Sequence, residues 1–176
     1  MDGRDMRLKR FLKVLPVAVF FAGVLRAEES PPWDRLAAQK GCLISAADVS
    51  FTVEGSLFAR KDWQLFFASA GKDEGIFRAL LGRFSSPRPT EVHICNFRNA
   101  TEGELAVFAA QQIVKRNWYA YDGDNDKIRR AARTNAASKA LLLKDLLSDK
   151  AACAQLRGYF MKLYKSRKPS GAAEKF

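Results

Sequence analysis

The sequence is poor in the residues and motifs that carry common chemistry. Its 176 residues include one histidine and three cysteines, and no Walker loop, GxGxxG, GxSxG or HExxH motif occurs. These absences exclude the usual signatures of P-loop, dinucleotide-binding, serine-hydrolase and zinc-protease sites. With 11 glycines and 6 prolines, the chain is not a collagen-like or low-complexity sequence either. We therefore expect no cofactor.

The most apolar run is short, and it lies directly behind a basic segment. Residues 14–25 (VLPVAVFFAGVL) form a run of 12 residues, whereas a membrane-spanning helix needs about 20. Five Lys and Arg residues precede this run within residues 1–13, an order typical of a signal peptide. We expect residues 1–27 to be a signal peptide cleaved after Ala27, with an uncleaved membrane anchor as the alternative.

Export determines the expected compartment and partners. Cleavage after Ala27 leaves 24 Lys and Arg against 17 Asp and Glu, a net charge of +7. A basic periplasmic or secreted protein attracts anionic partners. We therefore expect another protein or an anionic envelope component as the partner. We expect no nucleic-acid partner. We also expect that the protein is not an integral membrane protein after cleavage.

The rest of the chain has the composition of one folded domain. The whole sequence is 48% hydrophobic, with 13 Phe and three Trp, which supplies enough apolar surface for a core. Pro31 and Pro32 favour extended backbone. We expect an extended leader over 28–32, a single helical domain over 33–165, and a basic flexible tail over 166–176.

Apolar residues recur at helical spacing along most of this domain. The spacing predicts a helix over 61–70 with Gly71 as its C-terminal cap, and a second helix over 73–84. The sequence from Thr101 to Glu104 matches a capping box, in which the two end side chains bind free N–H groups of the first helical turn. The helix that follows is apolar around most of its circumference, so we expect it to be the central helix.

The C-terminal half predicts further helices. Residues 127–147 lack Gly and Pro and end in a Leu-rich segment, which predicts one long helix or two joined helices. A last helix is expected after Ser148 and Asp149, which can cap it. The fold class is therefore expected to be all-α, an irregular bundle or short array of about five to six helices.

Two segments admit extended structure, so a minor strand pair near 42–58 and 90–95 is an option. Val49, Phe51 and Val53 alternate like a strand, whereas Ser45 to Asp48 can cap a helix. For residues 42–58 we favour the helix.

The strongest chemical candidate is the set Glu91, His93 and Cys95. In extended chain these three side chains share one face, and Val92 and Ile94 point to the core. A cysteine, a histidine and a carboxylate together suggest a nucleophile, a base and an orienting group. Neighbours on one strand face lie about 6.6 Å apart, beyond hydrogen-bond reach, so we favour a structural role.

A second candidate is the acidic segment with Asp122, Asp124 and Asp126. Its spacing resembles the start of a calcium-binding loop, but Lys127 and Arg133 stand where glycine and glutamate are needed. We favour helix capping by this segment and treat the three carboxylates as weak metal candidates.

Basic residues open the helix that follows. Arg129, Arg130 and Arg133 lie close together in sequence and can contact an anion. Such a group is more often a solvated helix face, and no DNA-binding spacing accompanies it.

The three cysteines allow one disulfide in an oxidising compartment. Cys153 falls on an apolar helical stripe, whereas Cys42 and Cys95 lie in connecting segments. We expect the pair Cys42–Cys95, although the sequence alone leaves the other two pairings open.

Together these features favour an exported helical binding or structural protein of the cell envelope or the extracellular space, rather than an enzyme. One alternative is a Cys/His-dependent hydrolase or transferase. The other is a binder of anionic polymers through the basic helix face.

Overall fold

The computed structural model describes residues 31–43, 56–94, 98–134 and 136–167. These ranges contain seven α-helices, three short 3-10 helices and one three-stranded sheet. The α-helices are α1 (Trp33–Ala37), α2 (Lys61–Lys72), α3 (Glu74–Gly82), α4 (Glu102–Val114), α5 (Asp126–Ala132), α6 (Ala136–Ser148) and α7 (Lys150–Ser166). The strands are β1 (Gly41–Leu43), β2 (Pro89–Ile94) and β3 (Arg98–Thr101). The fold is mostly helical with a small sheet, so a purely all-α class is wrong.

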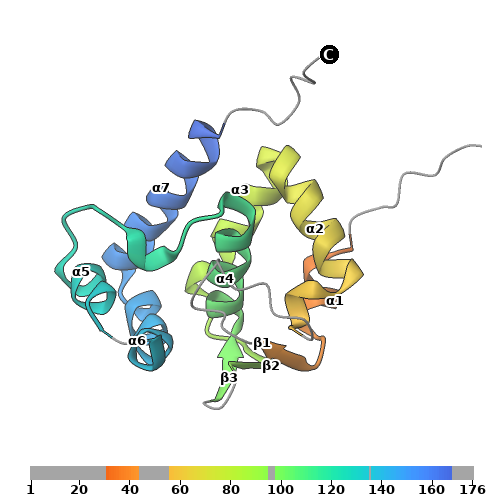
Figure 1. Cartoon of the computed structure of the whole chain (residues 1–176), viewed down its shortest axis with the longest axis horizontal. Coiled ribbons are helices and arrows are strands. Elements are labelled where there is room, and N and C mark those ends of the chain that lie inside the picture. Colours follow the sequence, from red (N-terminus) through yellow and green to blue (C-terminus); the bar gives the residue numbers. More distant parts are fainter. Residues whose placement is uncertain (1–30, 44–55, 95–97, 135, 168–176) are drawn as a thin grey trace, which may run out of the picture.

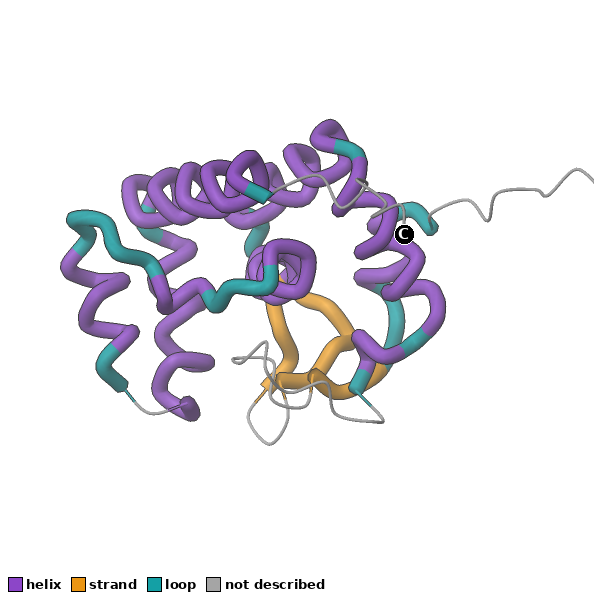
Figure 2. Tube along the Cα trace, turned by 45° about the horizontal axis from the view of Figure 1, so that its top comes forward, coloured by secondary structure: helices purple, strands orange, loops and turns teal. Residues whose placement is uncertain are grey.

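The sheet has the order β1-β2-β3, with β1 parallel and β3 antiparallel to β2. Strand β2 confirms the extended structure expected up to Ile94. Residues 42 and 43 lie in β1, so the preference for a helix over 42–58 is wrong there, and residues 44–55 lie outside the described part. Strand β1 is three residues long, too short to show an alternating pattern of its own. Figure 2 shows the strands together at one edge of the molecule, with helices around the remaining sides.

Helix α4 is the central helix, as expected. All its residues except Gln112 are buried, because other elements surround it. Figure 1 shows α2 on one side of α4, α6 and α7 on the other, and the sheet at its N-terminal end. The capping box is present: the Thr101 hydroxyl accepts a hydrogen bond from the Glu104 N–H at 3.3 Å, and the Glu104 carboxylate accepts one from the Thr101 N–H at 2.8 Å.

The predicted helices exist, but several ends differ. Helix α2 continues through Gly71, which therefore is not its cap. Asp73 caps α3 by accepting hydrogen bonds from two backbone N–H groups, and α3 ends at Gly82, followed by a 3-10 turn over Arg83–Ser85. The 127–147 segment forms two helices, α5 and α6, and Asp149 caps α7.

The buried apolar side chains form one core, to which α2, α3, α4, α6 and α7 all contribute. Its largest fully buried members include Trp63, Trp118, Phe77, Phe108 and Phe160. No helix in the described ranges combines the length and the apolar character that crossing a membrane requires.

Candidate functional site

The exposed face of the sheet holds two of the three residues of the Cys/His candidate. Glu91 and His93 are exposed, whereas Val92 and Ile94 are buried, so the predicted alternation is confirmed. Cys95 lies outside the described residues.

Cross-strand pairing adds two neighbours that the sequence did not suggest. His93 is in register with Cys42 on β1 and with Asn99 on β3, so all three are placed on one face of the sheet. Glu91 forms an ion pair with the Lys40 ammonium, at 4.0 Å.

The described residues around His93 do not form a catalytic arrangement. Among the described residues, His93 has no hydrogen-bond or ion-pair partner that would orient its ring. Cys42 is disulfide-bonded and so offers no thiolate nucleophile. Three cavities of about 260, 360 and 370 Å³ lie in the described part, and none of these three has His93 in its lining.

The cysteines differ in state. Cys153 is a free thiol in the core of the molecule, and burial raises the pKa of this thiol, which keeps it protonated and unreactive. Its buried position on α7 agrees with the expected apolar stripe. The pairing of Cys42 with Cys95 stays a prediction, since Cys95 is outside the described ranges.

The acidic segment before α5 acts on the backbone and on its own helix. Asn125, rather than Asp124, caps α5 by accepting hydrogen bonds from the Lys127 and Ile128 N–H groups at 3.0 and 3.2 Å. Asp126 accepts a hydrogen bond from Arg129 at 2.5 Å, which lowers the pKa of the Asp126 carboxyl.

The three carboxylates of this segment do not form a metal site in the structure. Asp122, Asp124 and Asp126 are all exposed. In the described portion of the chain, no three His, Cys, Asp or Glu side chains are close enough together to hold a metal ion.

The three arginines of the basic helix face have different surroundings. Arg129 is bound to Asp126, and Arg133 is exposed beyond the end of α5. Arg130 lines a groove of about 370 Å³ between α5 and α6. The structure therefore separates Arg130 from the other two as a candidate binding residue.

The α5–α6 groove combines an apolar floor with charged rims. Its lining comprises Lys127, Arg130, Thr134, Leu142, Asp145 and Leu146. Leu146 is buried at 3% exposure, whereas Leu142 is 37% exposed and is the one large hydrophobic side chain of the described residues that is classed as exposed. This volume lies in the range of small-molecule sites, roughly 300 to 1,000 Å³, which are mostly apolar with a few placed polar groups.

Some charged side chains on the groove rims have an oppositely charged partner, and others do not. The Lys127 ammonium is bound to Asp149, the capping residue of α7. Across the groove, Asp145 is exposed and contributes an electrostatic attraction to Arg98. The Arg130 guanidinium has neither a hydrogen bond nor an ion pair within the described residues. Of the two groove cations, Arg130 is thus the one without a bound acid within the described residues, and its charge contributes to lowering the pKa of the Asp126 carboxyl.

A second polar cluster, centred on Glu102, has a structural role. The Glu102 carboxylate is 3% exposed and accepts hydrogen bonds from Trp33 at 2.7 Å, Ser86 at 2.6 Å, Arg83 at 3.1 Å and Arg88 at 3.2 Å. Burial raises the pKa of the Glu102 carboxyl, but these hydrogen bonds and the two arginine charges outweigh burial, so its pKa lies below the usual value.

With four donors, the Glu102 carboxylate has no capacity left for a substrate. It joins α1, the turn after α3 and the start of α4. The sequence predicted only that this helix begins here. The burial of Glu102 and Glu104 depends on distant segments that cover the first turn.

No known family model matches the chain, and no curated protein or solved structure matches it either.

Proposed function

We propose that this chain is an exported binding protein of the cell envelope or the extracellular space, an irregular helical bundle that binds its partner in the α5–α6 groove. One observation carries the proposal: the Arg130 guanidinium, which has no hydrogen bond or ion pair within the described residues, and the exposed Leu142 line one groove of about 370 Å³. An exposed cation beside an apolar surface in one concave site suits a ligand that has both an anionic and an apolar part.

The arginines elsewhere in the described core support this choice. Arg83 and Arg88 bind Glu102, and Arg98 binds Glu104. These cations neutralise buried carboxylates, and removing them would leave a buried charge without a partner. Arg130 has no such structural partner.

The enzyme alternative has less support. Glu91 and His93 lie on an open strand face, and the nearest described cysteine, Cys42, is oxidised. A base needs a nucleophile within roughly 2.6 to 3.2 Å and a group that orients it. The described residues offer His93 neither.

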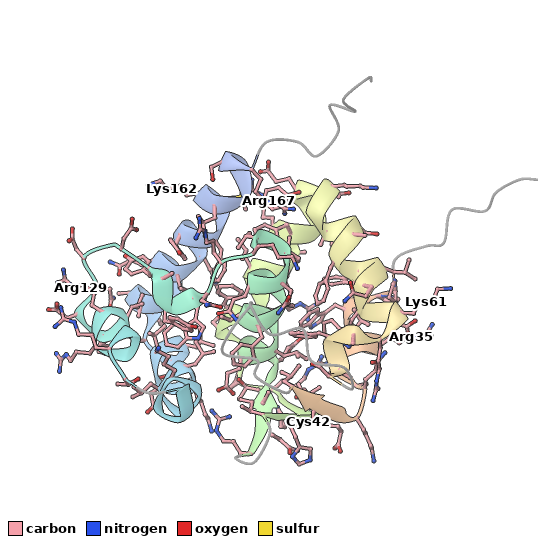
Figure 3. The ribbon with its side chains drawn as sticks, viewed as in Figure 1. Arg35, Cys42, Lys61, Arg129, Lys162 and Arg167 are labelled. Atoms are coloured by element: carbon pink, nitrogen blue, oxygen red, sulfur yellow. The ribbon has the colours of Figure 1, made fainter. Side chains whose placement is uncertain are left out.

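Binding of an extended anionic polymer also has less support. Such binding needs a continuous basic path along the surface. Figure 3 shows labelled basic side chains at separate places: Arg35 and Lys61 beside α1 and α2, Arg129 on the opposite side, and Lys162 and Arg167 at the end of α7. A local groove fits this distribution better than a polymer track.

The test compares the two surfaces in the native host. A deletion strain is complemented with the double variant R130Q/L142N or with the double variant E91Q/H93Q, and each protein is checked for folding by thermal melting. We expect the groove variant to lose the effect of the gene and the sheet variant to retain it. Loss of function in a folded E91Q/H93Q protein, with R130Q/L142N still active, would reject the proposal.

Export is part of the proposal and has its own measurement. N-terminal sequencing of protein isolated from the native host should show a first residue of Glu28. An intact Met1 on a cytoplasmic protein would reject export.

A further inference from the structure

We propose that the ligand of the α5–α6 groove is a single-chain amphiphile with an anionic head, such as a fatty acid carboxylate. This inference rests on the proposed function and adds the chemical class of the ligand. Its basis is the arrangement of one available cation, Arg130, at the rim of an apolar floor formed by Leu142 and Leu146.

The apolar part of the ligand follows from the exposure of the floor. Leu146 follows Leu142 by four positions on α6, so the two side chains lie on one face of that helix. Leu146 is buried by the protein, but Leu142 keeps 37% of its surface open. Covering apolar surface with a hydrocarbon chain stabilises a complex by about 0.8 kcal/mol for each buried CH₂.

The charge of the ligand's head group is inferred from the charged side chains on the two rims of the groove. Lys127 is neutralised by Asp149. Arg130 on one rim, whose charge also acts on Asp126, and Asp145 on the other form no ion pair within the described residues. A guanidinium binds a carboxylate or phosphate through two parallel hydrogen bonds. The net charge of +7 expected after cleavage adds a long-range attraction for anions. An anionic head therefore lies at Arg130, and Asp145 repels it.

The size of the site favours a small amphiphile over a protein partner. A stable protein interface buries about 800 Å² on each partner and centres on aromatic or arginine anchors. Among the side chains that line this groove, Leu142 is the one large hydrophobic that is exposed. That is enough for a hydrocarbon chain and too little for a protein interface.

The experiment is a titration of the full-length mature protein with dodecanoate below its micelle concentration, followed by methyl NMR of the leucines and by calorimetry. Acetate tests the head alone, and dodecyl maltoside tests a neutral amphiphile with the same tail. We expect dodecanoate to shift the Leu142 and Leu146 methyl signals, and both controls to bind at least about tenfold more weakly.

Three variants sharpen the test, each checked by thermal melting. Arg130→Gln should weaken dodecanoate binding about tenfold or more, since it removes a charged hydrogen-bond donor. Asp145→Asn should strengthen binding, because it removes a like charge. Arg78→Gln, which changes the net charge equally on the distant helix α3, should leave the affinity unchanged.

Several outcomes would overturn the inference. Equal affinity of dodecanoate for wild type and R130Q, or equal binding of dodecyl maltoside, would reject the anionic head. Weaker dodecanoate binding by D145N would show that Asp145 does not repel the head, and would reject the inferred head position. If dodecanoate does not bind while R130Q/L142N still abolishes function in the host, the ligand class is wrong and the groove remains the functional surface.

Discussion

The Arg98 guanidinium donates two hydrogen bonds, at 2.8 and 2.5 Å, to the carboxylate of Glu104, whose side chain is fully buried. The same carboxylate also accepts the Thr101 N–H of the capping box. This contact fixes strand β3 to the first turn of α4, and so ties the sheet to the central helix.

The contact predicts a large loss of stability when Arg98 is removed. Arg98→Ala leaves the buried Glu104 carboxylate without its counter-charge, so we expect the free energy of unfolding to fall by about 3 to 5 kcal/mol. Arg78→Ala is the matched control, because Arg78 forms an exposed pair with Glu74 on α3, and such pairs contribute about 0.5 kcal/mol or less. Urea denaturation of both variants measures the difference. Equal effects would show that Arg98 and Glu104 do not form a structural pair in solution.

The Glu102 cluster predicts an acid-dependent stability. Its pKa is lower in the folded protein than the usual value of about 4.3. A carboxyl with a lowered folded pKa contributes stability above its unfolded pKa and loses that contribution as the pH falls through the folded pKa.

We therefore expect the urea midpoint of the wild type to decrease as the pH falls below about 4.3. Glu102→Gln should be less stable at pH 7 and should show a smaller decrease on acidification. Glu91→Gln, on the exposed strand face, is the control for the loss of one carboxylate. A Glu102→Gln protein with the same acid dependence as wild type would contradict this assignment.

Close backbone packing at Gly103 gives a third prediction. A Cβ atom at this position would lie 2.4 Å from the Phe84 carbonyl oxygen and 3.0 Å from the Ser86 carbonyl oxygen. Both atoms belong to the backbone, so Gly103→Ala must displace α4 from the turn after α3, and we expect a loss of about 1 to 3 kcal/mol.

Gly158 provides the opposite case. It lies inside α7 with no atom within 4 Å of an added Cβ, so Gly158→Ala should raise the stability by up to about 1 kcal/mol through helix propensity. Thermal melting of both variants tests the pair. A Gly103→Ala protein as stable as wild type would mean that α4 and this turn are less closely packed than described.

The cysteines give a fourth prediction. Non-reducing peptide mapping of protein isolated from the native host should recover Cys42 joined to Cys95. Cys153 should react with an alkylating reagent only after denaturation, because it is 2% exposed. A peptide containing cross-linked Cys153 would contradict both its place in the core and the predicted pair.

Local signals explain how much of this fold could be predicted from the sequence. The starts of α4 and α7 are specified by Thr101 and Asp149, whose side chains bind N–H groups two or three residues away. Such caps depend on neighbouring residues alone, so the sequence shows them. Strand β1 has no local signal, because its pairing with β2 joins segments about fifty residues apart.

The burial of polar residues also depends on contacts between distant segments, so the sequence did not predict it. Gln111 is polar, yet it is fully buried, and its side-chain oxygen accepts the Trp118 N–H at 2.6 Å. This contact forms because Lys115, the residue directly after α4, has a left-handed backbone conformation with φ of 55°, which turns the chain back toward the helix. Trp118 itself lies in a separate 3-10 turn after α4 and still reaches the core.

The α5–α6 groove also could not be predicted from the sequence. The Leu-rich segment of α6 predicts core positions, and Leu143, Leu146 and Leu147 are indeed buried. That Leu142 is left exposed beside Arg130 depends on how α5 packs against α6. Only the four-residue spacing of Leu142 and Leu146 indicated that they share a face.

Site-specific photo-cross-linking in the native host tests the central claim most directly. A benzoylphenylalanine residue is placed at position 142 in one protein and at position 93 in another, and the adducts are separated and identified by mass. The groove account predicts an adduct from position 142 that disappears when Arg130→Gln is added, and no specific adduct from position 93. A specific adduct from position 93, with none from position 142, would contradict the account and place function on the face of Glu91 and His93.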